Sequence, residues 1–227
     1  FVETINGISE ACKYLDFPVV SGNVSFYNET QNKAISPTPT IGGVGLIKNL
    51  NNMITQKFKK IDSIIMVIGK TLGHLYQSEF FREVLQIRNG PPPDINLFNE
   101  KNNGLIIQKL ISKNILNAVH DVSSGGIMLA LLEMCISGEI GAKIKVSSNN
   151  FNPHEFFFGE DQSRYLIEIS EKNKDEVTKV LEKNSVYFEI LGKTQKESLE
   201  LDKEFNIKIS ELNKLNSLWF KNYFNEN

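Results

Sequence analysis

A short polar segment directly after an apolar one carries the residues best suited to chemistry. The stretch from Pro18 to Ser21 predicts a buried strand that breaks at Gly22, where the missing Cβ lets the backbone turn sharply or lie against a ligand. Amide, hydroxyl and carboxylate oxygens follow at once, from Asn23, Ser25, Asn28 and Glu29. Such oxygens suit phosphate, hydrated Mg²⁺ and ribose rather than a soft metal. The alternative is a turn after a strand in which Asn and Ser make local caps.

A second candidate is the loop that follows the apolar run 63–69. That run has the pattern of a central strand buried on both faces. Lys70 and His74 could add positive charge to a loop that contains two glycines, and the N-terminus of a helix predicted over 78–86 would offer free N–H groups to a phosphate. The spacing is not that of a Walker loop. The alternative is an ordinary connection in which Ser78 caps the helix.

Asp121 lies at the end of a predicted strand, 118–122, directly before the glycine-rich turn 123–126. In α/β layers ligands bind at this edge of the sheet, and a carboxylate there can hold Mg²⁺ directly or through water. The same carboxylate could instead cap the helix predicted over 127–136. The neighbouring His120 is predicted to be structural, because nothing beside it forms a nucleophile pair.

The segment from Phe156 to Arg164 passes from three aromatic residues into a polar cluster. Glu160, Asp161 and Gln162 could read a polar substrate together with Arg164. The alternative is a solvated turn, since most charged side chains are exposed.

Composition limits the classes of protein that this chain can belong to. It has 227 residues, 41% of them hydrophobic, which is enough to bury a core and argues against disorder. A net charge of -2 gives no electrostatic footprint for nucleic acid or for an anionic membrane. No apolar run approaches the ~20 residues that cross a bilayer. Cys12 and Cys135 lack a CxxC spacing and are predicted to be reduced core residues of a cytosolic protein.

The periodicity predicts a mixed α+β protein in two parts, with a boundary near Asn52. The first part contains a helix over 3–15 and a strand over 40–47 that carries three glycines. In the second part, Asp94 caps a long helix that runs to residue 113. The elements predicted after it are strands over 118–122, 141–146, 164–170 and 187–191, helices over 127–136 and 174–183, a hairpin over 197–209 and a last helix from Ser210.

Several sequence blocks, in one order, resemble phosphoribosylformylglycinamidine synthase, also called formylglycinamide ribonucleotide amidotransferase. They are SGNVSFYNET and SPTPTIGGVGLI, then GKTLGHLYQSEFFRE, NAVHDVSSGGIMLALLEM and FFFGEDQSRYLIEIS. The resemblance covers residues 5–194 and implies a C-terminal fragment of the synthetase subunit. It also implies that residues 1–52 end a β-barrel-forming, ATP-binding domain. Residues 53–227 would then be the α/β C-terminal domain of the aminoimidazole ribonucleotide synthetase superfamily.

The resemblance implies roles for three residues of the first block. By that match Gly22 contacts ATP, Asn23 ligates Mg²⁺ and Ser25 touches the substrate. The later blocks match a half that is degenerate or auxiliary in the family. Its candidates are therefore weaker: Lys70, His74, Asp121, Glu160, Asp161 and Gln162. Ser124 stands where the family usually has Asp, which makes a metal at this second site more doubtful.

The implied reaction is ATP-dependent amidine synthesis in purine biosynthesis. ATP phosphorylates the amide oxygen of formylglycinamide ribonucleotide, and ammonia then displaces the phosphate to give formylglycinamidine ribonucleotide. The implied partners are the missing N-terminal half, a glutaminase subunit and a small accessory subunit in the cytoplasm. The family's catalytic histidine lies in the missing half, so the fragment is expected to be inactive alone. A truncated barrel would also expose strand edges, which predicts self-association.

Two other interpretations stay open. The chain could act as a non-catalytic, nucleotide-holding scaffold that braces the barrel and docks partner subunits. It could also come from a cousin such as aminoimidazole ribonucleotide synthetase or selenophosphate synthetase. The wording SGNVSFYNET argues against the cousins, which carry a different sequence at that strand.

Overall fold

The computed structural model describes residues 1–36, 38–145, 152–202 and 204–225. The chain separates into two compact units, residues 1–50 and 51–227. Val146, the last residue of the strand predicted over 141–146, lies outside the described residues.

Unit 1 holds a helix and a small hairpin. Helix α1 (Val2–Leu15) confirms the predicted helix and ends where Asp16 takes a left-handed conformation and its N–H bonds the Cys12 carbonyl. Strands β1 (Glu29–Thr30) and β2 (Lys33–Ala34) pair antiparallel. Gln31 and Asn32 both have positive φ at the hairpin tip.

The two longer strands predicted in unit 1 are wrong. Residues 18–21 and 40–47 form no ladder with any described residue. Their apolar side chains face solvent, with Val20 92% and Val44 94% exposed. A strand is stabilised by a neighbour that takes up its N–H and C=O groups and covers one face. The described residues of unit 1 supply no such neighbour, so the local pattern alone does not fix a strand.

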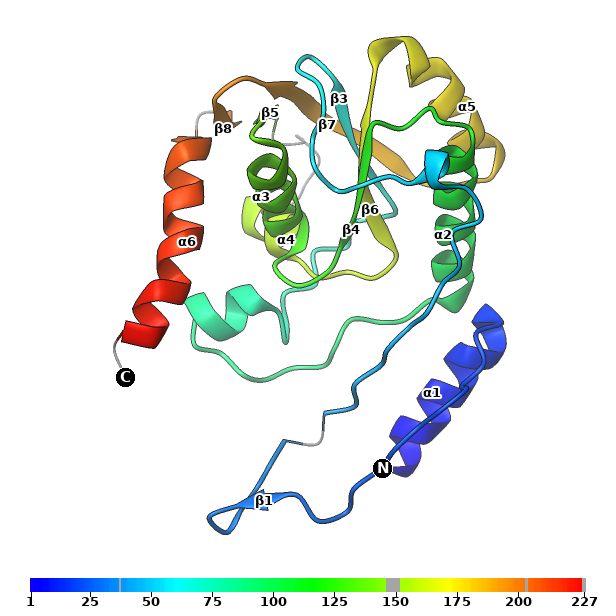
Figure 1. The fold of residues 1–227 in the computed structure, drawn as a ribbon, viewed down its shortest axis with the longest axis vertical. Helices are drawn as coiled ribbons and strands as arrows, with labels where there is room; N and C mark the ends of the chain where they lie inside the picture. Colours follow the sequence, from blue (N-terminus) through cyan, green and yellow to red (C-terminus); the bar gives the residue numbers. More distant parts are fainter. Residues whose placement is uncertain (37, 146–151, 203, 226–227) are drawn as a thin grey trace. The chain divides into compact units, whose positions relative to one another are not determined.

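Unit 2 is built on a mixed sheet, which Figure 1 shows at its centre. Among the described residues the sheet has seven strands in the order β4-β6-β3-β7-β5-β8-β9. Neighbours are antiparallel except for the parallel pair β5–β8. The strands are β3 (Ile64–Ile68), β4 (Ala118–Val122), β5 (Gly141–Ile144), β6 (Arg164–Ile169), β7 (Phe188–Gln195), β8 (Ser198–Leu201) and β9 (Phe205–Lys208). The predicted hairpin over 197–209 is confirmed by β8 and β9.

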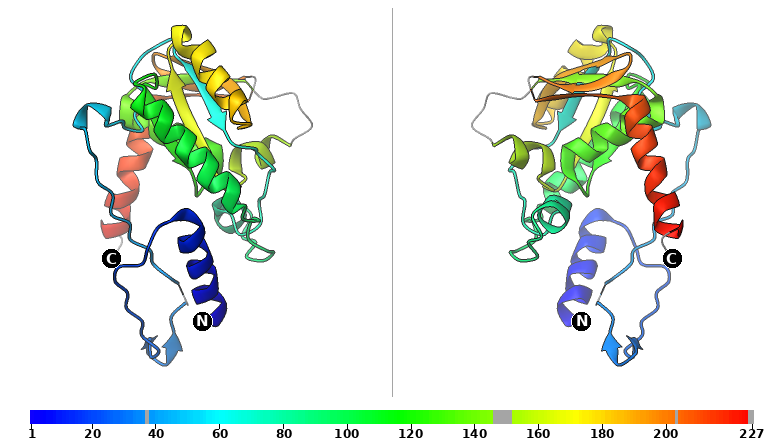
Figure 2. Two further views of the ribbon diagram at one scale, coloured as in Figure 1. Left: turned by 90° about the vertical axis from the view of Figure 1, so that its right-hand side faces the viewer. Right: turned by 90° about the vertical axis from the view of Figure 1, so that its left-hand side faces the viewer.

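Helices cover both faces of the sheet, so β3 is buried on both sides as its sequence predicts. Ile64, Met66 and Ile68 pack toward α2 (Leu97–Ser112) and α5 (Lys174–Lys183). Ile65 and Val67 pack toward α3 (Gly126–Gly138) and α4 (Pro153–Phe158). Figure 2 shows α2 and α5 together on one side of the sheet. The fold is therefore α+β.

Two helix starts differ from the predictions. A π-helix over Phe80–Val84 replaces the α-helix expected over 78–86, although Ser78 Oγ does accept the Phe81 N–H at 3.2 Å. Helix α2 is capped by Asn96, whose side chain accepts the Asn99 N–H, and not by Asp94. An N-cap side chain must reach an N–H two or three positions on, and Asn96 is the residue that does so here.

The last helix, α6 (Ile209–Asn225), confirms the predicted position. Ile209 and Leu212 pack on the core, whereas Leu215, Leu218 and Trp219 are exposed. Only the first turn of α6 therefore packs on the core, and the apolar side chains of the following turns face solvent.

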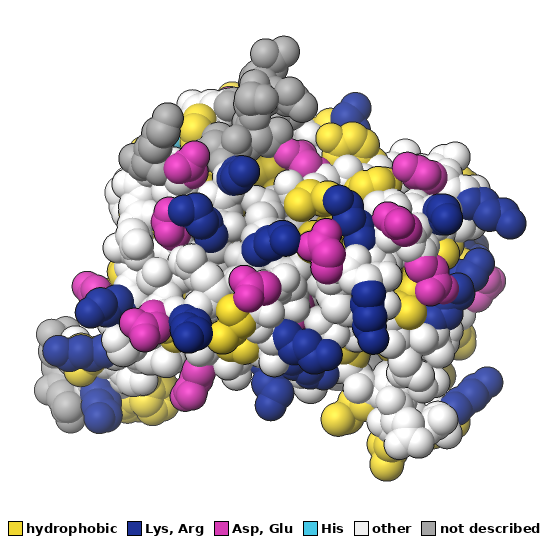
Figure 3. Space-filling model, turned by 90° about the horizontal axis from the view of Figure 1, so that it is seen from above, with side chains coloured by type: hydrophobic (Ala, Val, Ile, Leu, Met, Phe, Trp, Pro, Cys, Tyr) yellow, Lys and Arg dark blue, Asp and Glu magenta, His cyan; other side chains and the backbone are white. Residues whose placement is uncertain are grey.

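Charges of both signs are interspersed over the face of the molecule seen in Figure 3. This agrees with the small net charge of -2. Among the described residues, no helix combines the length and apolar character that a membrane crossing requires.

Candidate functional site

Three connections of unit 2 meet at one edge of the sheet. The end of β3 and the end of β4 both lie beside the start of β6, because Ile68 and Asp121 are both paired with Tyr165. This register brings the loop after β3, the turn after β4 and the segment before β6 together. Gly69 makes the approach possible: its φ is +90°, and a Cβ there would clash with the Ser163 carbonyl oxygen.

The carboxylate of Asp161 is held by backbone N–H groups of the loop after β3. Its Oδ2 accepts from Leu72 and Gly73, each at 2.9 Å, and its Oδ1 accepts from His74 at 3.1 Å. Successive N–H groups that converge in this way form an anion-binding nest. The loop in which a phosphate was expected therefore has three of its N–H groups occupied by the protein's own carboxylate.

Arg164 braces the same segment from inside the protein, with 1% of its surface exposed. Its guanidinium donates to the carbonyls of Asp161 and Gly159 at 3.1 and 2.6 Å, and to Thr71 Oγ1 at 3.2 Å. Burial lowers the pKa of Arg164, and the charges of Asp161 and Glu160 oppose that shift. The interpretation of 160–164 as a solvated turn is wrong, since Asp161 is also only 4% exposed.

Glu160 connects two further elements through one oxygen. Its Oε1 accepts from the Glu79 N–H at 2.7 Å and from the Gly125 N–H at 2.8 Å. These donors precede the π-helix and α3 respectively, where N–H groups have no partner inside the helix. Glu160 therefore ties the loop after β3 to the glycine turn after β4.

Two open clefts flank this segment and share Pro93, Gln162 and Ser163. The first, of about 380 Å³, has hydroxyl and carboxylate walls and includes Glu100, Asp121, Ser123, Ser124, Glu160, Arg164 and Tyr165. The second, of about 420 Å³, adds aromatic and amide groups and includes Lys70, His74, Tyr76, Phe81, Asn96, Asn99 and Asn103. The site candidates of unit 2 thus gather at one place, as the strand order requires.

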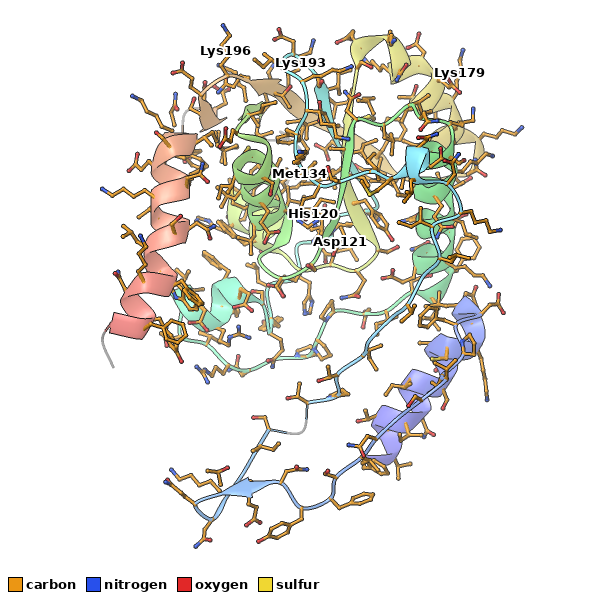
Figure 4. All side chains as sticks on the ribbon, viewed as in Figure 1. His120, Asp121, Met134, Lys179, Lys193 and Lys196 are labelled. Atoms are coloured by element: carbon orange, nitrogen blue, oxygen red, sulfur yellow. The ribbon has the colours of Figure 1, made fainter. Side chains whose placement is uncertain are left out.

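Asp121 and His120 lie at the end of β4 (Figure 4). The Asp121 side chain is 68% exposed and lines the first cleft. His120 is nearly enclosed, and its Nε2 lies 2.7 Å from Glu133 Oε2 on α3. Its Nδ1 lies 3.3 Å from Asp121 Oδ1. The ring therefore connects β4 to α3, which agrees with the structural role predicted for His120.

The remaining candidates of unit 2 differ in whether they already make contacts within the protein. Lys70 and Gln162 are exposed at the rim of the second cleft. His74 is committed, since its Nε2 lies 3.0 Å from the Pro91 carbonyl and its own carbonyl accepts the Glu160 N–H at 2.9 Å. Lys70 and Gln162 can therefore reach a ligand without breaking a described contact, whereas His74 cannot.

Two cleft residues were not found from the sequence. Glu100 lies in the first turn of α2 and lines the first cleft, where burial raises the pKa of its carboxyl and a hydrogen bond from the Ser163 backbone opposes the shift. Burial likewise raises the pKa of the Tyr165 hydroxyl, with the charges of Glu100 and Asp121 adding to the effect. No motif marks either residue, because their proximity depends on how α2 crosses β6.

The first candidate stretch lies in unit 1 and is open to solvent. Gly22, Asn23 and Ser25 are all exposed, and a Cβ on Gly22 would meet nothing within 4 Å. Gly22 does not have positive φ, so the sharp turn expected there is not of the left-handed kind. The Ser25 carbonyl accepts the Asn28 side-chain amide at 2.9 Å. The polar atoms of Asn23 and Ser25 can thus face a ligand.

A complete metal centre is not present in the described part of the chain. Those residues contain no group of three or more His, Cys, Asp or Glu side chains that could hold a metal ion. The arrangement can bind polar ligands in open clefts, and Asn23 could contribute one oxygen to a cation held largely by other groups.

Residues 80–202 match the family model for AIR synthase related protein, C-terminal domain. Two proteins named phosphoribosylformylglycinamidine synthase subunit PurL are similar over nearly the whole chain. The one from Pelagibacter ubique is 53% identical over 223 residues, which are 98% of this chain and 30% of that protein. The one from Bartonella quintana is 41% identical over 225 residues, 99% of this chain and 30% of that protein. The chain spans about 30% of the length of these relatives.

Solved structures of low sequence identity share the fold. T. maritima PurL complexed with FGAR has a TM-score of 0.59 at 15% identity, over 72% of this chain and 30% of that chain. T. maritima PurL complexed with ATP has a TM-score of 0.56 at 14% identity, over 72% of this chain and 28% of that chain. The structure of PurLQS from Thermotoga maritima has a TM-score of 0.57 at 15% identity, over 72% and 28%.

Proposed function

The chain belongs to the family of AIR synthase related proteins, through their C-terminal domain, and on that premise we propose that it is a segment of a phosphoribosylformylglycinamidine synthase. The enzyme would convert formylglycinamide ribonucleotide, ATP and glutamine-derived ammonia to formylglycinamidine ribonucleotide, ADP and phosphate. The observation that carries the proposal is the 53% identity to a PurL subunit over 98% of the chain.

The geometry of unit 1 supports a role in nucleotide binding. Gly22 has no side chain to hinder a close approach, and the space around it is open. On the resemblance of the block SGNVSFYNET we assign Gly22 to ATP, Ser25 to the substrate and Asn23 to Mg²⁺, and the exposure of all three on one short segment is compatible with these roles. Structures of PurL with ATP, with ADP and with AMPPCP among the fold relatives support ATP as the nucleotide.

A magnesium site cannot be completed from the described residues, which contain no suitable cluster of carboxylates, histidines or cysteines. Asn23 would supply one amide oxygen, and Mg²⁺ prefers six oxygens at octahedral geometry. The other ligands would come from ATP phosphates, from water and from protein outside this segment.

The proposed domain arrangement follows from the same assignment. Residues 1–52 would end an ATP-binding, barrel-forming domain, and residues 53–227 would form the α/β C-terminal domain. The exposed apolar side chains of 18–21 and 40–47 support this, because those stretches would gain partner strands in a barrel. The rest of the subunit, a glutaminase and a small accessory subunit would be the cytoplasmic partners. The solved PurLQS assembly supports partner subunits of this kind.

One observation favours the alternative, a non-catalytic scaffold, for unit 2. Asp161 and Glu160 are committed to backbone N–H groups, and Arg164 to carbonyls and a hydroxyl. Residues with these roles stabilise a fold whether or not a ligand binds. Unit 2 could thus brace the active site while unit 1 contributes to it.

The experiment that tests the proposed function uses the full-length subunit with its partner subunits. The Asn23→Ala variant is expected to lower turnover by at least about tenfold, since it removes one oriented oxygen from a charged transition state. Thr30→Ala, an exposed polar change in β1, serves as the matched control and should leave turnover unchanged. Normal turnover of Asn23→Ala with an altered melting temperature would support the scaffold instead.

A further inference from the structure

The sequence contains three Asn-Gly pairs, two in helices and one in irregular backbone. Asn6–Gly7 lies within α1 and Asn103–Gly104 lies within α2, whereas Asn89–Gly90 lies in an irregular, exposed segment between the π-helix and α2. Asn is among the thermolabile residues. When glycine follows it, no side chain blocks the glycine nitrogen from the Asn carboxamide.

We propose that Asn89 is a site of spontaneous deamidation and isoaspartate formation. The Gly90 backbone nitrogen attacks Asn89 Cγ, a new C–N bond closes a succinimide ring, and the bond from Cγ to Nδ2 breaks. Ammonia leaves with the proton lost from the Gly90 amide. Water then opens the ring at either carbonyl and gives isoaspartate or aspartate, so the carboxamide becomes a carboxylate without any oxidant or cofactor.

The surroundings of Asn89 allow this attack. Within the described residues, neither the Asn89 side chain nor the Gly90 N–H makes a hydrogen bond, so neither has to break one first. Both residues are exposed, which admits the water that opens the ring. The φ of Gly90 is +94°, a conformation that this residue type adopts without strain.

The two helical pairs are protected by comparison. Asn103 is only 6% exposed, and its amide nitrogen donates to Ser163 at the carbonyl oxygen, 2.9 Å, and at the hydroxyl, 3.1 Å. Inside a helix, ring closure also requires the turn to open locally, which costs free energy at each attempt. Asn6 lies in the same kind of backbone in α1. These pairs are internal controls for Asn89.

The modification would act on the second cleft of unit 2. Gln77 donates to the Gly90 carbonyl at 2.8 Å, and His74 Nε2 lies 3.0 Å from the Pro91 carbonyl. The Tyr76 ring packs so closely on Gly90 that a Cβ there would clash. Isoaspartate inserts one extra backbone atom directly before these contacts and adds a negative charge. The loop that surrounds Asp161 would therefore lose its outer support.

The test is peptide mapping by mass spectrometry of the intact chain after ageing at neutral pH. Asn89 is expected to convert at least about tenfold faster than Asn103, since helix opening reduces the reactive population. A synthetic peptide spanning 86–94 gives the rate of Asn89 deamidation in the absence of folded structure. The Asn89→Gln chain should form no isoaspartate at position 89. Equal rates at Asn89 and Asn103, or an Asn89 rate far below that of the peptide, would overturn the proposal.

Discussion

The guanidinium Nη1 of Arg164 lies 3.6 Å from Oδ2 of Asp161, and both side chains are closed off from solvent. The two charges stand three residues apart at the entrance to β6, and both contact the loop after β3. Asp161 accepts backbone N–H groups of that loop, and Arg164 donates to its Thr71 Oγ1. A buried pair of this kind holds loops in one arrangement as long as both partners are present.

Replacing Asp161 with Ala should therefore destabilise unit 2 strongly. The change leaves three backbone N–H groups without an acceptor and removes the carboxylate that pairs with Arg164, and a loss of about 3 kcal/mol is expected. Urea denaturation followed by circular dichroism measures it. Asp121→Ala, at an exposed carboxylate at the end of β4, should change stability by less than about 0.5 kcal/mol. Similar stabilities for the two variants would contradict the role given to Asp161.

Two glycine-to-alanine changes should act in opposite directions. Gly69→Ala places a Cβ against the Ser163 carbonyl at a φ of +90° and should cost at least about 1–3 kcal/mol. Gly104→Ala lies in α2, where the nearest atom to the new Cβ is the Tyr165 hydroxyl oxygen at 3.4 Å. This change should raise the free energy of unfolding by up to about 1 kcal/mol, because alanine favours a helix more than glycine does. Thermal unfolding of the two variants measures both effects. A lower melting temperature for Gly69→Ala alone would show that the loop after β3 requires glycine at position 69.

Glu100 should make stability depend on pH in a defined direction. Burial raises the pKa of its carboxyl in the folded state, so the folded chain binds this proton more tightly than the unfolded chain does. Its contribution to stability is therefore fully present below the unfolded pKa and is lost as pH rises through the raised folded pKa. Glu100→Gln should be the more stable chain at neutral pH, and the difference should shrink on acidification. A difference that grows in acid would show the opposite shift.

Ser25 offers a test of substrate contact in the full-length subunit. If its hydroxyl touches formylglycinamide ribonucleotide, Ser25→Ala should raise KM for that substrate about tenfold, the effect of one lost hydrogen bond. KM for ATP should stay as it is. Steady-state kinetics with each substrate varied separately gives the answer, and equal effects on both KM values would argue for a structural role.

Unit 1 should promote self-association of the isolated chain. Val20, Val44 and Leu46 are each more than four-fifths exposed and lie on extended segments without strand partners. Exposed apolar surface of this kind favours contact between copies. Light scattering after size-exclusion chromatography should show species larger than a monomer, and the double variant Val20→Ser, Leu46→Ser should shift them toward monomer. An unmodified chain that stays monomeric at high concentration would refute this expectation.

The sequence by itself determined most of unit 2. The apolar run that became β3, the helix over 174–183 and the hairpin over 197–209 are set by local periodicity and turn residues, and all three are confirmed. The family blocks likewise suffice to identify the class of protein, which the family model confirms. Local pattern succeeds here because each element finds, within the same unit, the core that its apolar side chains require.

Only the tertiary structure decided which polar residues are free to meet a ligand. Asp161 and Glu168 have the sequence surroundings of surface carboxylates, yet both are buried, and Glu168 accepts the N–H groups of Lys59 and Lys60 at 2.8 and 3.1 Å. Their backbone donors lie about 90 to 110 residues away along the chain, so no local window contains them. The strands expected over 18–21 and 40–47 failed for the same reason. A backbone segment forms a strand only when a distant part of the chain supplies a neighbouring strand. A carboxylate is buried as a structural acceptor only when distant N–H groups donate to it.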